Sequence, residues 1–133
     1  MRITSTRWAA LAVAVALSGP VAGCVAAAAA GAAGGVYLTS RGAESLVSGS
    51  VDQVAARAQT VMKDMNIAPS AEKTETSGDK HELKGKQGDL DITIQMQRSD
   101  SATTKVEVTA RKNLAEWDKD YAKEVLTRIV KES

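Results

Sequence analysis

Two neighbouring segments of the chain alternate strictly between apolar and polar residues, in 90–98 and again in 104–111. A period of two places successive side chains on opposite faces of a β-strand, so each segment predicts a strand with one buried and one solvated face. The short polar connection between them favours an antiparallel pair. Such a sheet needs cover on one face only. The apolar members are Leu90, Ile92, Ile94 and Met96 in the first segment and Val106, Val108 and Ala110 in the second.

Two amphipathic segments can supply that cover. From about 51 to 65, apolar residues recur at three- and four-residue spacing, and Ser50 with Gln53 forms a capping-box pattern at the start. A second apolar stripe runs from about 119 to 132, with acids early and bases late, as the helix dipole favours. Both segments therefore predict helices.

The remaining segments are weaker but complete a fold. Residues 43–49 predict a first strand, and residues 71–86 predict a polar hairpin at a solvated edge of the sheet. The last helix has two possible starts, at Asn113 or at Asp118, and we expect the second. The chain thus predicts an α+β two-layer sandwich, in which two helices lie on one face of an antiparallel sheet of four to five strands.

The N-terminal segment is of a different kind. Two arginines precede an apolar core at 8–18, which has the length of a signal-peptide core and is too short to cross a bilayer as a helix. The segment ends in Val-Ala-Gly-Cys at 21–24, which resembles a bacterial lipobox. The resemblance implies cleavage between Gly23 and Cys24 and a covalent lipid, such as palmitate, on Cys24.

This interpretation divides the chain into a signal peptide at 1–23, a lipidated cysteine with an Ala/Gly-rich tether at 24–42, and a small α/β domain at 43–133. The residue after the cysteine is Val25 rather than Asp. By resemblance to Gram-negative lipoproteins, this favours an outer-membrane lipoprotein that faces the periplasm. A competing interpretation is that the Ala/Gly tract packs within or remodels the membrane, because small residues let helices approach closely.

The order of these features resembles a family of small bacterial lipoproteins that is catalogued only as a domain of unknown function. The shared features are the lipobox, the Ala/Gly tract, the Ser-capped helix at 50–54, a strand meander and a final amphipathic helix. The resemblance extends from Cys24 to the C-terminus. It implies no catalytic residue, because the family has no established active site.

Few residues carry catalytic or metal-binding chemistry. His81 is the only histidine, and we expect it to be a solvated surface residue rather than part of a catalytic triad. A zinc site would need more histidine or cysteine than the chain has. Asp89 and Asp91 offer at most weak calcium ligands. Removing 1–23 changes the formal charge from +1 to −1, because two of 17 basic residues leave while all 16 acidic ones stay. A nearly neutral chain does not indicate nucleic-acid binding.

We therefore expect a protein that is not an enzyme and has no cofactor beyond the lipid. It would be anchored in the membrane and would bind an envelope protein or assist assembly. The alternative is a small periplasmic hydrolase or ligand-binding domain with a pocket near His81 or Asp118. Trp117 and Tyr121 lie one helical turn apart and predict either a ledge for a ligand or sugar, or core packing at the end of the sheet.

Overall fold

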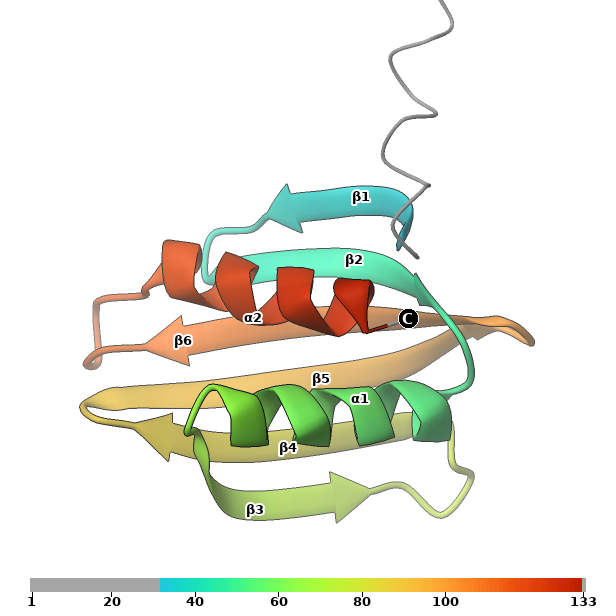
Figure 1. Ribbon diagram of the computed structural model, residues 1–133, viewed down its shortest axis with the longest axis horizontal. Coiled ribbons are helices and arrows are strands. Elements are labelled where there is room, and N and C mark those ends of the chain that lie inside the picture. Colours follow the sequence, from blue (N-terminus) through green and yellow to red (C-terminus); the bar gives the residue numbers. More distant parts are fainter. Residues whose placement is uncertain (1–31, 133) are drawn as a thin grey trace, which may run out of the picture.

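The computed structural model describes residues 32–132, which form a two-layer α+β sandwich (Figure 1). The elements in chain order are β1 (Ala32–Leu38), β2 (Gly42–Ser48), α1 (Val51–Asp64), β3 (Ala68–Thr74), β4 (Lys80–Gln87), β5 (Leu90–Asp100), β6 (Thr103–Arg111) and α2 (Lys119–Lys131). Within this part of the chain the strands form one antiparallel sheet in the order β1-β2-β6-β5-β4-β3. Both helices cover the same face, α2 over β2 and β6 and α1 over β4 and β5.

The two alternating segments form the centre of the sheet, as β5 and β6. Ile94 is the cross-strand partner of Val108, and both are fully buried beneath the helices. The intervening residues Thr93 and Thr109 are also partners and lie on the opposite face. The prediction of a sheet with one buried face is therefore confirmed.

The helix starts also follow the sequence. The hydroxyl of Ser50 accepts a hydrogen bond from the backbone N–H of Gln53 at 3.2 Å, and the Gln53 side chain accepts one from the Ser50 N–H at 3.0 Å. Asp118 caps α2 by accepting a hydrogen bond from the N–H of Tyr121 at 2.9 Å. Asn113, the other possible start, instead accepts hydrogen bonds from two N–H groups within a turn that precedes the helix.

The sheet has six strands among the described residues, rather than the expected four to five. The additional strand, β1, lies inside the stretch 24–42 that we expected to be a tether, and it pairs with β2 at the edge of the sheet. Ser45 donates a hydrogen bond from its hydroxyl to the carbonyl of Gly35 at 2.8 Å, next to an irregularity in the pairing. Backbone pairing to β2 helps to hold this strand, and its sequence, in which four of the seven residues are Ala or Gly, has no alternating apolar pattern.

The polar hairpin is present, but only one of its strands lies at an edge. All seven residues of β3 are exposed, whereas β4 lies between β3 and β5. Leu83 and Gly85 of β4 are buried beneath α1 and the loop that follows it. The hairpin is therefore part of the core on one side.

Gly85 gives a test of this packing. A Cβ atom added there would lie 2.5 Å from Ile67 Cγ2, 2.7 Å from Met62 Cε and 2.9 Å from the Ala68 carbonyl oxygen. We expect Gly85→Ala to lower the free energy of unfolding by about 1–3 kcal/mol, the usual cost of overpacking a core. Urea unfolding measures it, with Lys86→Ala on the exposed side of the same strand as the control. Equal midpoints for Gly85→Ala and the control would contradict the packing.

Candidate binding surface on the open sheet face

The helices leave one face of the sheet uncovered, and this open face is polar. Strand register aligns its side chains in rows that cross several strands. One row is Lys84, Thr93 and Thr109, and the next is Glu82, Gln95 and Glu107. The alternation of β5 and β6 predicted that these residues share a face, but only the pairing places particular ones side by side.

Glu82 is the best-connected carboxylate of this face. Its side chain accepts a hydrogen bond from the Gln95 amide at 2.9 Å and lies 3.3 Å from the Lys84 ammonium. The Gln95 hydrogen bond, followed by the interactions with Lys84, lowers the pKa of Glu82, while partial burial opposes the shift. The carboxylate is therefore ionised and engaged at neutral pH.

Trp117 lies over the end of the open face. Its backbone forms an isolated bridge with Arg111 at the end of β6. The guanidinium carbon atoms of Arg41 and Arg111 lie 5.5 and 5.6 Å from the indole centroid, within the range of cation–π attraction. Arg111 also donates a hydrogen bond from Nε to the carbonyl of Asn113 at 3.0 Å, which ties the loop to the strand.

Two adjoining hollows are lined in part by this tryptophan. One, of about 230 Å³, includes Arg41, Gln95 and Glu107 in its lining, and the other, of about 280 Å³, includes Asp91 and Arg111. They share Lys84, Thr93, Thr109 and Trp117. Together they form a shallow polar groove across β4, β5 and β6, with Trp117 as its apolar wall. We call it the open-face groove.

Of the two alternatives for Trp117 and Tyr121, a shared ledge or core packing, neither describes both residues, because the structure places them on different faces of the sheet. Tyr121 packs against the core under α2, whereas Trp117 lines the groove on the other face of the sheet. The residues are four apart, but Trp117 precedes the Asp118 cap and is not helical, so helical spacing does not apply. Core packing therefore describes Tyr121 and not Trp117. Burial, above all, raises the pKa of Tyr121, and its hydroxyl has no hydrogen-bond partner among the described residues.

His81 also differs from the expected solvated residue. Its side chain is only 10% exposed, its Nε2 lies 2.7 Å from a carboxylate oxygen of Glu72, and its Nδ1 lies 3.3 Å from the Thr74 hydroxyl. Gln59 of α1 donates a hydrogen bond to the same carboxylate at 3.3 Å. The sequence could not show this, because the contacts depend on the pairing of β4 with β3 and on the position of α1 beside β3.

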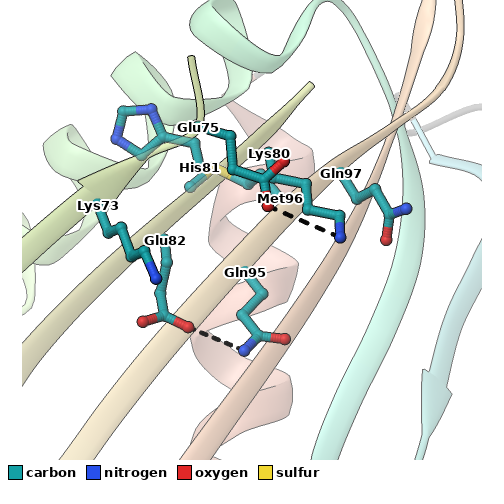
Figure 2. Close-up of a pocket in the computed structure, with 8 residues that line it drawn as sticks. All are labelled: Lys73, Glu75, Lys80, His81, Glu82, Gln95, Met96 and Gln97. Atoms are coloured by element: carbon teal, nitrogen blue, oxygen red, sulfur yellow. Dashed lines mark hydrogen bonds and ion pairs between the residues drawn. The ribbon is translucent and has the colours of Figure 1, made fainter. Parts of the chain in front are cut away.

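A hydroxyl, an imidazole and a carboxylate in contact can activate a nucleophile. The hollow of about 240 Å³ at this end of the sheet is lined by residues that include His81, but Figure 2 shows its imidazole pointing away from Lys73, Glu82 and Gln95. The ring instead links the edge strand β3 to β4 through Glu72 and Thr74. The geometry indicates a structural contact.

Residues 32–132 contain neither a cluster of metal-ligating side chains nor a membrane-spanning helix. No group of three or more His, Cys, Asp or Glu side chains there could hold a metal ion, and Asp91 forms an ion pair with Lys86 at 3.4 Å. No helix in the same range is long and apolar enough to cross a membrane. Gly23 and Cys24, the predicted cleavage and lipidation residues, lie outside the described residues.

No family model matches the chain, and neither the curated proteins nor the solved structures include a match to it. The resemblance to small bacterial lipoproteins therefore remains a prediction that rests on the sequence features alone.

Glu82 gives a pH-dependent test of the open face. A carboxyl group whose pKa is lowered by folding adds stability above its unfolded pKa, near 4.3, and loses it as the pH falls through the lower folded value. We expect Glu82→Gln to be less stable than the parent at pH 7, by under about 1 kcal/mol for a partly exposed pair. The difference should vanish in the acid range below the ordinary glutamate pKa. Urea unfolding from pH 7 to pH 3 measures it, and a pH-independent difference would contradict the assignment.

Proposed function

We propose that this chain is a membrane-anchored bacterial lipoprotein, held by a lipid on Cys24 in the outer membrane and facing the periplasm. Its folded domain would be a non-enzymatic binding module for an envelope partner. The observation that carries the binding role is the open-face groove, in which Trp117, within cation–π range of two arginines, lies above an uncovered polar sheet. The lipobox-like residues 21–24 support the anchor.

The uncovered face favours binding because its groups are held in place but not covered. Gln95 and Lys84 are fixed through Glu82, and Trp117 through Arg41 and Arg111. Pre-ordered side chains lower the entropy cost of binding. The hydrolase alternative has less support, because the imidazole of His81 is directed away from the nearby hollow. A ligand-binding domain stays compatible with the groove.

The anchor is tested by substituting the cysteine. We expect the parent protein to incorporate labelled palmitate in a bacterial host and to fractionate with the outer membrane. Cys24→Ser should lose the label and leave the membrane fraction. A Cys24→Ser form that loses the label but stays in the bilayer would favour membrane packing by the Ala/Gly tract instead. Palmitate incorporation that survives the substitution would contradict lipidation at Cys24.

The binding face is tested by crosslinking in intact cells. A photo-reactive residue at Gln95, exposed on the open face, should capture an envelope component. The same residue at Ala56, exposed on the solvent side of α1, should not. Capture from Ala56 alone would place the binding surface on the helices and contradict the proposal.

A further inference from the structure

The composition of the open-face groove narrows the class of ligand. We propose that the groove binds a neutral oligosaccharide, a glycan chain that crosses β4, β5 and β6 beside Trp117. This inference rests on the proposed function only for the location of the protein, the periplasm, where it would meet a glycan. The groove itself consists of described residues.

Charge balance is the first argument. The lining contains equal numbers of cationic and anionic side chains, which favours a neutral ligand over a polyanion such as a nucleic acid. The cations are Arg41, Lys84 and Arg111, and the anions are Glu82, Asp91 and Glu107. One cation and one anion of the lining are paired with each other, because the Lys84 ammonium lies 3.3 Å from the Glu82 carboxylate.

Hydrogen-bonding capacity is the second argument. The hydroxyls of Thr93 and Thr109 and the carboxylate of Glu107 form no hydrogen bond or ion pair with another described residue. A threonine hydroxyl both donates and accepts, and a carboxylate accepts. Sugar hydroxyls also do both, so adjacent hydroxyls of one ring can satisfy this set. An apolar ligand would bury these polar groups without hydrogen-bond partners, which would reduce the binding free energy.

The third argument concerns the wall of the groove. Trp117 lines both hollows, and Arg41 and Arg111 each line one of them. The part of the indole that lines the hollows offers apolar surface to the C–H groups of a sugar ring, while the two arginines over the ring hold the indole in its orientation. The centre of a protein interface is usually its most apolar part. Here the centre is the Thr93–Thr109 pair, which favours a glycan over a protein segment.

Trp117 also provides the readout, because the other tryptophan of the chain, Trp8, lies in the predicted signal peptide. The probe is N-acetylated chitotetraose, a neutral glycan, added to the full processed protein in detergent micelles. We expect saturable heat in titration calorimetry and a shift of the Trp117 emission. Thr109→Val keeps the shape of the side chain and removes the hydroxyl, and it should weaken binding about tenfold, as the loss of one hydrogen bond of about 1.4 kcal/mol predicts. The control Thr60→Val makes the same change on α1 and should bind like the parent.

Absence of saturable binding by the folded parent would overturn the inference, and so would equal affinities for Thr109→Val and the parent. Binding of heparin, a polyanion, in place of chitotetraose would also overturn it. These failures are distinct from failure of the proposed function. If the residue at Gln95 captures a protein but the groove binds no glycan, the proposed binding module is supported and the glycan inference is contradicted. If the protein binds the glycan but carries no palmitate, the glycan inference is supported and the proposed anchor is contradicted.

Discussion

Burial of one sheet face beneath two short helices is the constraint on which the rest of the structure depends. Neighbouring strands lie about 4.8 Å apart, so six strands span roughly 24 Å or more, whereas two packed helices cover about 20 Å. The outermost strands therefore extend beyond the helices. This explains why β3 is exposed along its length and why Tyr37 and Leu38 of β1 are more than half exposed. The edge strands are held by backbone pairing and a few side-chain contacts, such as that of His81 with Glu72, whereas the middle of the sheet is held by buried side chains.

The same constraint decides how much of the fold the sequence could predict. Where side chains drive burial, as in β5, β6, α1 and α2, the periodicity is strong and the predicted elements are present. In β1, pairing to β2 and the hydrogen bond from Ser45 to the Gly35 carbonyl hold the strand on the sheet, and neither interaction requires a periodic sequence pattern. A strand made largely of Ala and Gly therefore has the composition of a tether.

The sequence predicts which residues of the candidate surface share a sheet face, but not which of them are neighbours on it. Alternation separates the polar residues of β5 and β6 from the buried ones, but it does not show that Lys84 lies beside Thr93, because that depends on register with β4. The position of Trp117 on this face could not be predicted from alternation at all. Its position follows from the bridge to Arg111 and from the N-cap of α2 at the next residue, Asp118. The partners of His81 lie in β3, and Glu72 is held in turn by Gln59 of α1, so the sequence pattern alone did not distinguish a polar setting from a solvated one.

The presence of β1 in the sheet changes what the proposed anchor implies for the groove. Ala32 is eight residues after Cys24, so a fully extended chain between them spans at most about 29 Å. The groove on β6, β5 and β4 begins two strands from β1 and ends four strands from it, at about 10 to 19 Å across the sheet. Thr109 and Arg111 of the groove also lie five and seven residues further along β6 than Thr104, the residue level with Ala32, which adds about 17 to 24 Å along the strands. With the lipid on Cys24, the groove could therefore lie at most about 60 Å from the membrane. Such an anchor would restrict the domain to material close to the membrane surface.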